Sequence, residues 1–468
     1  MQYRRHILPH FTKGHFPLLT AFALSFCACN RLPSERPVEG IQVEARSAFA
    51  ASLSASQVKI ATNWLSTLRD PQLTRVVHQA LANNPDLRAT ATQLRAAKEG
   101  TIIGRAARLP DFTTSANTSR TRSNGQSSEF YSISLNAGWE PDVWGRLRDL
   151  EDATIADYEA TLADFRSARL SLAINTAQSW CNLVTAESQL TLAKETLASF
   201  RQNYQIIQRG YKLGTLRPLD DAFGRSNVAA AEGDLKARQL DRDEAARTLQ
   251  ILLGTYPDAF ITASTQLPRI PPVRAGLPSE LLARRPDLTA SRARIYASAK
   301  RADATRKNLL PSFGLTANSG TSSPELSRLL DPSNLASTLA ANIAQNLYSG
   351  GRLTAQARQS LADNENQIHL YEGDVLQAFR EVESALATEQ SLRKQEQFLL
   401  TDVENTALAE RWAESDFVEG LDVGTGPSIL EVLEAQRRAL NAKAGLIALK
   451  NSRLQNHLDL LLALGGSI

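Results

Sequence analysis

Two stretches of the chain place apolar residues along one face of a helix. The apolar positions recur every three or four residues, which is the period of an amphipathic helix. Proline is absent from residues 142–217 and 333–426, so uninterrupted helices of about 60 residues, about 90 Å long, are allowed. The two stripes are Leu170, Ala173, Ile174, Ala177, Cys181 and Val184, and Val375, Ala378, Phe379, Val382, Ala385 and Leu386.

Each stripe is followed by a break and a second helical pattern. Glycine and proline interrupt the spacing at Gly214 to Pro218 and at Gly420 to Pro427, as expected for helix ends. Amphipathic spacing then resumes over residues 219–253 and 429–464. The pattern therefore predicts a long helix, a tight turn and a returning helix, twice.

Strand periodicity precedes each long helix. Apolar residues alternate with serine, threonine, asparagine and glycine, which predicts strands with one apolar and one polar face. Shorter alternations at Phe112 to Thr118 and Phe313 to Ser319 supply a partner strand in each half. The main apolar sets are Tyr131, Ile133, Leu135, Ala137 and Trp139 in the first half, and Leu335, Leu339, Ile343 and Leu347 in the second.

The two halves are copies of one unit. The segment Leu81 to Leu87 (LANNPDL) reappears as Leu282 to Leu288 (LARRPDL), and each is followed by a Leu-Pro pair, at Pro110 and Pro311. The motif Gly145-Arg-Leu likewise matches Gly351-Arg-Leu. Ordered matches at nearly constant offset indicate an internal duplication.

Composition supports long helices and argues against nucleic-acid binding. Aromatic residues make up only 6% of the chain, and alanine, leucine, glutamine, arginine and glutamate recur throughout, as in long helices. The net charge of +3 arises from 52 basic and 49 acidic residues without the single-sign block that nucleic-acid binders carry. Nucleic acid is therefore not an expected partner.

The N-terminus has the features of an export signal. Arg4, Arg5 and Lys13 precede a mostly apolar run, Phe16 to Ala28, that ends in small residues and is short for a membrane span. A membrane anchor helix is the alternative. Cys29 follows this run and precedes a polar, proline-containing stretch, so we predict lipidation at Cys29, with an ordinary cleavage site as the alternative.

No catalytic or metal motif is evident, so neither an enzyme, a cofactor nor a metal is expected. The chain contains no HExxH, no Walker loop and no complete GxGxxG. His78, His369 and His457 are far apart in helical patterns, and we interpret them as solvated or core residues. Cys181 lies on an apolar stripe and is expected to be a small core residue.

The strands suit a membrane better than a soluble domain. Two strand pairs cannot satisfy their own edges in lipid, where every backbone polar group needs a partner, so closure would need strands of other chains. Trp139, Trp144 and Tyr348 fall near the strand ends, where aromatic belts lie. A soluble hairpin packed on helices is the alternative.

The ordered motifs resemble the outer-membrane factor (TolC-like) family, specifically the lipoprotein branch of RND-type efflux systems. The resemblance covers residue 60 to the end. It rests on Trp64-Leu65, Asp70-Pro71, the LANNPDL and LARRPDL segments, Leu109-Pro110, Leu310-Pro311, Trp139-Glu-Pro-Asp142, Trp144-Gly-Arg146, Leu219-Asp220, Tyr348-Ser-Gly-Gly-Arg352, Leu430 to Arg437 and Leu462 to Gly466.

This resemblance implies a mainly α-helical fold with a membrane β-barrel portion. The expected assembly is a homotrimer in the bacterial outer membrane. Four strands per protomer would close a twelve-stranded barrel, and the helices would form a long periplasmic helical barrel. The expected organisation is a signal peptide at 1–28, a lipidated segment at 29–62, helical-barrel segments at 63–110 and 146–255 around a strand hairpin at 111–145, a crossing at 256–278, and helical-barrel segments at 279–310 and 351–468 around a second hairpin at 311–350.

The resemblance also implies a function and partners. The expected role is the outer-membrane channel of a tripartite efflux pump that exports drugs or other toxic compounds, docked on a periplasmic adaptor (a membrane fusion protein) and an inner-membrane RND transporter. A type I secretion exit duct is the nearer alternative. A periplasmic coiled-coil scaffold or adaptor is the alternative of another class, and it would leave the duplicated strands unexplained.

The helical turns are expected to form a periplasmic aperture closed in part by carboxylates. Asp422 is the first candidate and Asp416 the second, because a ring of carboxylates near an axis repels itself and binds cations. A solvated turn aspartate is the alternative. The second turn is longer than the first: Gly420 and Leu430 are 10 apart (430 − 420), whereas Gly214 and Leu219 are 5 apart (219 − 214).

Overall fold

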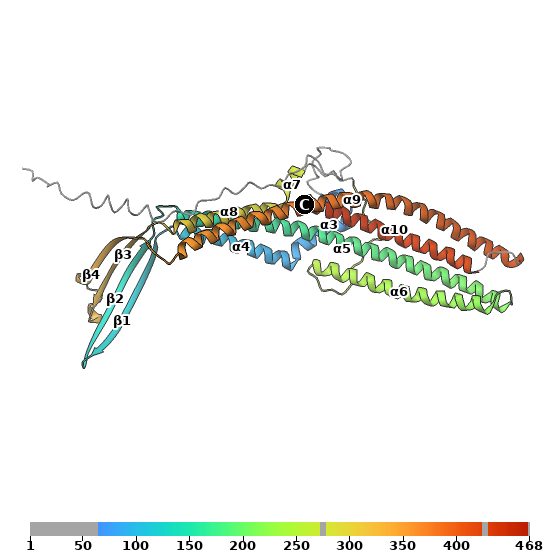
Figure 1. Ribbon diagram of the computed structural model, residues 1–468. Helices are drawn as coiled ribbons and strands as arrows, with labels where there is room; N and C mark the ends of the chain where they lie inside the picture. Colours follow the sequence, from blue (N-terminus) through green and yellow to red (C-terminus); the bar gives the residue numbers. More distant parts are fainter. Residues whose placement is uncertain (1–63, 272–277, 424–428, 467–468) are drawn as a thin grey trace, which may run out of the picture. The chain divides into compact units, whose positions relative to one another are not determined.

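The computed structural model describes residues 64–271, 278–423 and 429–466, and consists of long helices and one sheet (Figure 1). The predicted signal peptide and Cys29 lie outside the described residues. The first half contains α2 (Trp64–Thr67), α3 (Pro71–Asn83), α4 (Pro85–Ala106), β1 (Asp111–Ser123), β2 (Gln126–Trp139), α5 (Arg146–Lys212) and α6 (Pro218–Leu252).

The second half repeats this order. It contains α7 (Pro278–Arg284), α8 (Pro286–Lys307), β3 (Ser312–Ser323), two 3-10 turns η1 (Leu326–Arg328) and η2 (Pro332–Asn334), β4 (Leu335–Ala344), α9 (Arg352–Val423) and α10 (Ile429–Ala463). The repeated order of helices and strands confirms the internal duplication that the motifs predicted.

The long helices exceed the predicted length. The helix α5 has 67 residues and α9 has 72. The predicted break at Gly420 to Pro427 separates α9 from α10, although α9 continues past Gly420 to Val423 before α10 begins at Ile429. A single glycine costs a helix only about 1 kcal/mol, and the next proline is Pro427.

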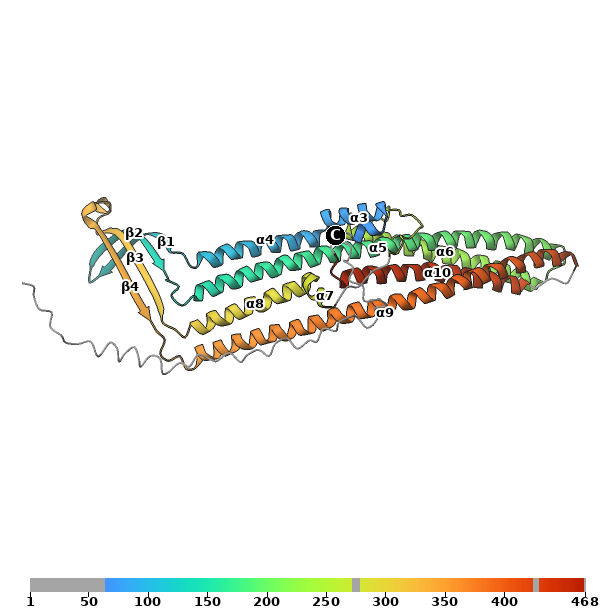
Figure 2. The same cartoon turned by 90° about the horizontal axis from the view of Figure 1, so that it is seen from above.

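The four strands form one antiparallel sheet in the order β1-β2-β3-β4, and they lie side by side in both views (Figures 1 and 2). The two predicted hairpins are therefore joined through β2 and β3. The prediction that the fourth strand extends to Leu347 is wrong, because β4 ends at Ala344, opposite Ser312. The residue before Ser312 is Pro311, which has no N–H to continue the ladder.

The chain divides into two compact units. One contains the sheet, with Gly100–Ala156 and Ile295–Ile368. Within it, the buried carboxylate of Asp149 on α5 accepts from Lys300 Nζ at 3.2 Å and also from Lys307 Nζ, both on α8. Lys307 Nζ donates in addition to the carbonyl of Gly145, at 3.2 Å. These contacts bind the start of α5 to the end of α8.

The other unit contains Asp157–Arg294 and His369–Ile468, together with described residues up to Glu99. Its core brings α3, α5, α6 and α10 together, and the predicted stripe on α5 lies inside it. Cys181 is fully buried, as expected of a small core residue, and burial raises the pKa of its thiol to about 12.

Each LANNPDL-type motif joins two helices to the end of a returning helix. Asn84 separates α3 from α4, and its Nδ2 donates to the carbonyl of Leu252, the last residue of α6, at 3.0 Å. Arg285 separates α7 from α8, and its Nη1 donates to the carbonyl of Ala463, the last residue of α10, at 3.2 Å. Residues before proline avoid the α conformation, so each motif breaks its helix where this contact forms.

A glycine follows each returning helix and touches the same junction. Gly254 has φ +66°, and a Cβ there would lie 2.7 Å from the carbonyl oxygen of Asn83. Gly465 has φ +67°, and a Cβ there would lie 3.1 Å from the carbonyl oxygen of Arg284. The positive φ and the close backbone approach both require glycine.

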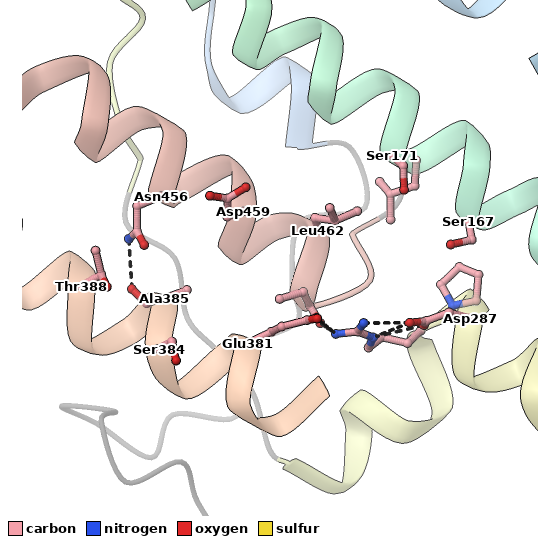
Figure 3. Close-up of a pocket in the computed structure, with 14 residues that line it drawn as sticks. Ser167, Ser171, Asp287, Glu381, Ser384, Ala385, Thr388, Asn456, Asp459 and Leu462 are labelled. Carbon is pink, nitrogen blue, oxygen red and sulfur yellow. Dashed lines mark hydrogen bonds and ion pairs between the residues drawn. The ribbon is translucent and has the colours of Figure 1, made fainter. Parts of the chain in front are cut away.

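Arg285 needs carboxylate partners because it is largely buried. Figure 3 marks the interactions of Asp287 and Glu381 with dashed lines. Arg285 Nη2 lies 2.7 Å from Asp287 Oδ2 and its Nη1 lies 2.7 Å from Glu381 Oε2 on α9. Burial lowers the pKa of Arg285 and raises that of Asp287, but their mutual hydrogen bonds reverse both shifts. The second junction is therefore an ion-pair network, and it borders an open cavity of about 420 Å³.

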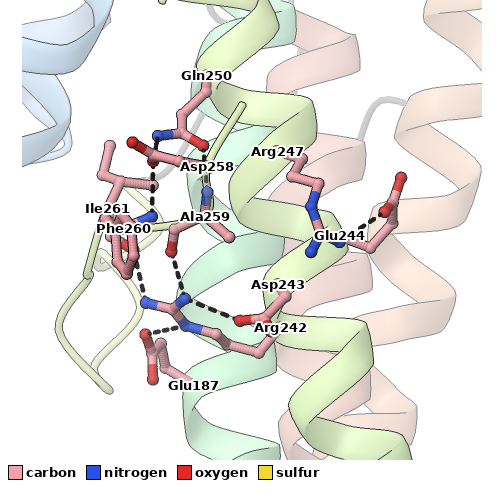
Figure 4. A network of polar contacts seen from close by, with 10 residues as sticks. All are labelled: Glu187, Arg242, Asp243, Glu244, Arg247, Gln250, Asp258, Ala259, Phe260 and Ile261. Carbon is pink, nitrogen blue, oxygen red and sulfur yellow. Dashed lines mark hydrogen bonds and ion pairs between the residues drawn. The ribbon is translucent and has the colours of Figure 1, made fainter. Parts of the chain in front are cut away.

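A second arginine network holds the start of the crossing between the repeats (Figure 4). Arg242 on α6 donates to Glu187 Oε1 at 2.8 Å and to the carbonyls of Ala259 and Ile261, each at 2.6 Å. Gln250 Oε1 accepts from the backbone N–H of Ala259 at 2.8 Å. These bonds hold Ala259 at φ +65°, a strained conformation for alanine.

Candidate functional site

One face of the sheet carries large apolar side chains on all four strands, together with serine and threonine and, towards the first hairpin turn, the charged residues Arg120, Arg122 and Glu129. Residues paired directly across antiparallel strands point to the same side, and the register aligns Leu135 with Thr114 and Ser319, and Ala317 with Leu339. The large apolar side chains on this face are exposed within the chain, including Phe112, Leu135, Leu339 and Ile343 at 66%, 52%, 81% and 70%. Such a face requires an apolar environment.

The opposite face is polar and uncharged beyond its first residue. Asp111 is the only ionisable residue on it within the described strands. The remaining positions carry mainly serine, threonine, asparagine, glycine and alanine, and the sheet therefore separates an apolar side from a hydrated side. This is the two-faced pattern that the sequence predicted for both hairpins.

The two hairpins turn by different means. Ser123 pairs with Gln126, so the first hairpin has a two-residue loop, Asn124-Gly125, with φ of 51° and 81°. Asn-Gly with two positive φ values is the preferred sequence for such a loop. The second hairpin instead passes through η1 and η2. The Asn-Gly dipeptide was a signal for the first turn that our sequence analysis did not use.

Aromatic side chains gather where the strands begin and end beside the helices. Trp139 closes β2, and its Nε1 donates to the carbonyl of Arg108 at 2.9 Å. Trp144 Nε1 donates to the carbonyl of Pro311 at 2.7 Å, and its ring lies 6.1 Å from that of Phe313. Tyr348 follows β4 and is exposed. Indole rings with one polar contact and one apolar face suit a membrane interface.

The sheet has two free edges. Within the described part of the chain, β1 pairs only with β2 and β4 only with β3. Free edges expose unpaired N–H and C=O groups, and in lipid such groups cost several kcal/mol each. An isolated copy of this sheet is therefore incomplete as a membrane structure.

The turn between α5 and α6 is rigid and contains buried carboxylates. The Gly210 carbonyl accepts from the N–H groups of Thr215 and Leu216, at 2.9 and 3.3 Å, and Gly214 has φ +76°. Asp220 Oδ2 accepts from the N–H of Arg217 at 2.9 Å. Burial raises the pKa of Asp220, but hydrogen bonds from Arg217 outweigh it and leave the pKa below its ordinary value.

Asp221 connects the same turn back to α5. Its Oδ1 accepts from the hydroxyl of Tyr204 at 3.2 Å, and its Oδ2 lies 2.9 Å from Arg225 Nη2. The Leu219-Asp220 motif in the sequence does not by itself indicate these contacts. Pro218 and Asp220 in the first turn were a helix-start signal, but the pairing with Tyr204 depends on the fold.

The predicted aperture residues are only partly described. Asp416 is exposed on α9 beside Phe417, which is buried with Ile207, Ile429 and Val432 in an apolar cluster. Asp422 lies in the last turn of α9, and its side chain and residues 424–428 of the following turn are outside the described residues. The role of Asp422 and Asp416 in closing the periplasmic aperture therefore stays a prediction.

The histidines are dispersed, as expected. His78 and His369 are exposed, and His369 Nδ1 lies 3.0 Å from Glu372 Oε2. His457 is buried, and burial followed by the charge of Arg453 lowers its pKa to about 4. In the parts of the chain that the structure describes, no cluster of histidine, cysteine and carboxylate residues could hold a metal ion. Nor does any described helix have the length and apolar character of a membrane span.

The outer membrane efflux protein family matches the chain twice, over residues 76–255 and 277–466. The chain belongs to this family. Each match covers one of the two repeats. An outer membrane efflux protein is an outer-membrane channel of an efflux pump, and the prediction of that family, location and function is confirmed.

Relatives of this efflux protein align over nearly its whole length. It is 31% identical to outer membrane protein OprJ of Pseudomonas aeruginosa, covering 95% of this chain and 94% of OprJ. It is 31% identical to the toluene efflux pump outer membrane protein TtgF of Pseudomonas putida, covering 97% of both chains. A crystal structure of CusC, described as a transmembrane channel, superposes with a TM-score of 0.83 at 26% identity, covering 93% of this chain and 99% of CusC.

Proposed function

We propose that three copies of the chain close their sheets into one twelve-stranded barrel in the outer membrane, with the helices continuing as a periplasmic tunnel. The observation that carries this proposal is the two-faced sheet with free edges at β1 and β4. In an antiparallel order of four, β1 and β4 run in opposite directions. The β4 of one copy can therefore pair antiparallel with the β1 of the next, which leaves no free edge.

In this assembly the two faces of the sheet meet different solvents. The exposed apolar set, including Phe112, Leu339 and Ile343, faces lipid, and the serine, threonine and asparagine set faces a water-filled lumen. Trp139, Trp144 and Tyr348 lie at the periplasmic interface of the membrane, where the aromatic belt is expected. A coiled-coil scaffold would need neither the apolar nor the polar face of the sheet.

We propose that the helical end docks on a periplasmic adaptor, and through it on an inner-membrane RND transporter that supplies the energy. An open groove of about 570 Å³ runs beside α5, α6 and α10 near this end. Apolar Phe223 and Leu430 line it together with the charged residues Asp234, Arg238 and Glu434. A groove between helices that is lined by both apolar and charged side chains suits another helical protein.

The proposed cargo is small toxic molecules, and the duct itself would catalyse nothing. Relatives are named for different cargoes: TtgF for toluene efflux and the CusC protein of Escherichia coli, 28% identical, for cation efflux. A pump that selects the cargo accounts for this variety. A type I secretion duct remains the alternative within the class, and loss of drug resistance with intact protein secretion would separate the two.

Two further sites complete the proposal. Acylation of Cys29 would anchor the N-terminus in the membrane, and Cys29→Ala should abolish incorporation of labelled palmitate. Asp422, with Asp416, would restrict the periplasmic aperture. Asp422→Asn should then raise uptake of large antibiotics such as vancomycin. The matched control is Asp402→Asn, at an exposed position of α9 that is farther from the turn, and it should not raise this uptake.

The central test is fractionation of the full-length protein. We expect it in the outer membrane, migrating as a trimer on unheated gels and as a monomer after boiling. A proline at Thr114, the fourth residue of the free edge strand β1, should prevent trimer formation, whereas proline at Ser128, beside the hairpin turn, should do so far less. Recovery of the wild-type chain as a soluble periplasmic monomer would falsify the proposal.

A further inference from the structure

One level of the sheet carries amide side chains on its polar face. Thr113 pairs with Asn136, Asn136 with Asn318, and Asn318 with Thr338, so these four residues cross all four strands in a single row. Asn318 Nδ2 donates to Asn136 Oδ1, and Asn136 Nδ2 lies 3.4 Å from Ser115 Oγ. The row is therefore a hydrogen-bonded set of neutral donors and acceptors.

Apart from Asp111, the rows on either side carry smaller side chains. One contains Ser115, Ser134, Gly320 and Ala336, and the other contains Asp111, Gly138, Thr316 and Ala340. A Cβ at Gly320 would lie 2.4 Å from the Ile133 carbonyl oxygen, so glycine is required where these strands approach. Asn136 and Asn318 consequently project farther from the sheet than their neighbours along the strands.

We propose that Asn136 and Asn318 form an uncharged, hydrogen-bonding girdle that makes the exit lumen at its own level indifferent to the sign of a solute's charge, next to the row that carries the carboxylate of Asp111. This inference rests on the proposed function, because the polar face must line a closed barrel. Charged rings select ions by sign. A ring of amides that can both donate and accept instead replaces water around cations, anions and neutral polar solutes alike.

The test measures the local potential at the girdle with a reporter thiol. Thr338→Cys places the thiol beside Asn318, and it is reacted from the cell exterior with a cationic (trimethylammonioethyl) and an anionic (sulfonatoethyl) methanethiosulfonate. The ratio of the two rates is divided by the ratio for 2-mercaptoethanol in the same buffer. Native Cys181 is buried with a pKa of about 12, and the unsubstituted protein measures any remaining background.

For Thr338→Cys combined with Asp111→Asn, which removes the carboxylate of the adjacent row, we expect a normalised ratio within about twofold of unity. Adding Asn318→Asp should raise it about tenfold in favour of the cationic reagent, since three carboxylates then surround the lumen at this level. Adding Asn318→Ala should leave it unchanged, because the lumen stays neutral. If Asn318→Asp prevents assembly, Asn136→Asp provides the same charge from the adjacent strand.

Two results would overturn the neutral girdle: a ratio beyond about fivefold in the Thr338→Cys protein that also carries Asp111→Asn, or no response to either aspartate substitution in an assembled trimer. Failure of the proposed function has a different signature. Leu339→Cys, on the opposite face of β4, should not react with these membrane-impermeant reagents. Reaction at Leu339→Cys without reaction at Thr338→Cys would show that the faces are assigned the wrong way round.

Discussion

The last turns of α6 and α10 can be compared position by position. Leu252 and Ala463 are 211 residues apart (463 − 252), and so are Gly254 and Gly465 (465 − 254). At the same offset Arg242 corresponds to Arg453, and both are hubs of ion pairs: Arg453 binds Glu389 and Glu396 at 2.7 and 2.6 Å. The backbone plan of the two repeats is therefore the same.

The chemistry that holds the two turns differs. The first repeat uses the neutral amide of Asn84, which also accepts from the N–H of Leu87 at 3.0 Å, and it carries Ala246 in its core. The second uses the cation Arg285 and carries His457 at the position of Ala246. Because Arg285 also binds Glu381, the second junction includes α9. The two repeats share the geometry of this junction, but only the second junction is held by charge.

The largest expected effect comes from substituting the glycine that follows the returning helix in each repeat. Gly254→Ala should lower the free energy of unfolding by roughly 2–4 kcal/mol, because alanine disfavours positive φ and its Cβ would overlap the Asn83 carbonyl. Gly465→Ala should cost about half as much, since its Cβ has more room. Gly233→Ala, an open position in α6, should instead stabilise by up to about 1 kcal/mol. Denaturant unfolding of the purified proteins checks the order, and equal losses at Gly254 and Gly233 would contradict it.

The next largest effect distinguishes the charged junction at Arg285 from the neutral amide junction at Asn84. Arg285→Ala should cost about 2–3 kcal/mol, less than a fully buried pair because Asp287 and Glu381 still reach water. Asn84→Ala should cost about 1–2 kcal/mol through the unsatisfied Leu252 carbonyl. In a double-mutant cycle, Glu381→Ala should add little once Arg285 is gone. A full additional loss would show that Glu381 does not act through Arg285.

The smallest expected effect is a pH dependence of the free energy of unfolding, which arises from His457 in the second repeat. His457 has a folded pKa of about 4, below the ordinary 6.5, so the unfolded chain binds a proton first as pH falls. Stability should therefore decline from about pH 6.5 downwards and level off below pH 4, with a loss of about 2 kcal/mol by pH 5. His457→Ala, which copies the first repeat, should flatten this slope, measured as unfolding free energy from pH 7 to 5. An unchanged slope would exclude His457 as its source.

The parts of this fold that sequence predicts are those governed by local periodicity. The stripe around Cys181 and the alternation from Tyr131 to Trp139 each follow from one segment facing one environment, and both are confirmed. The end of β4 could not be read from β4 itself, because it depends on Pro311 in the opposing strand. The Asn124-Gly125 turn was readable and was missed.

The junctions depend on contacts that no local pattern encodes. Asn84 and Leu252 are 168 residues apart, and Arg285 and Ala463 are 178 apart. Their motifs were visible as repeats, but a repeated asparagine or arginine before proline does not indicate which carbonyl it binds. The same holds for Asp221, whose partner Tyr204 is brought near only by the tight α5–α6 turn.

The free edges of β1 and β4 have a genetic consequence under the proposed closure. A ring closed by three identical seams fails if one copy cannot form its seam. A cell producing equal amounts of wild-type and edge-defective chains would then hold roughly one fully wild-type assembly in eight if the copies mix at random. An edge-defective allele should therefore be dominant over a functional one, whereas a null allele should be recessive.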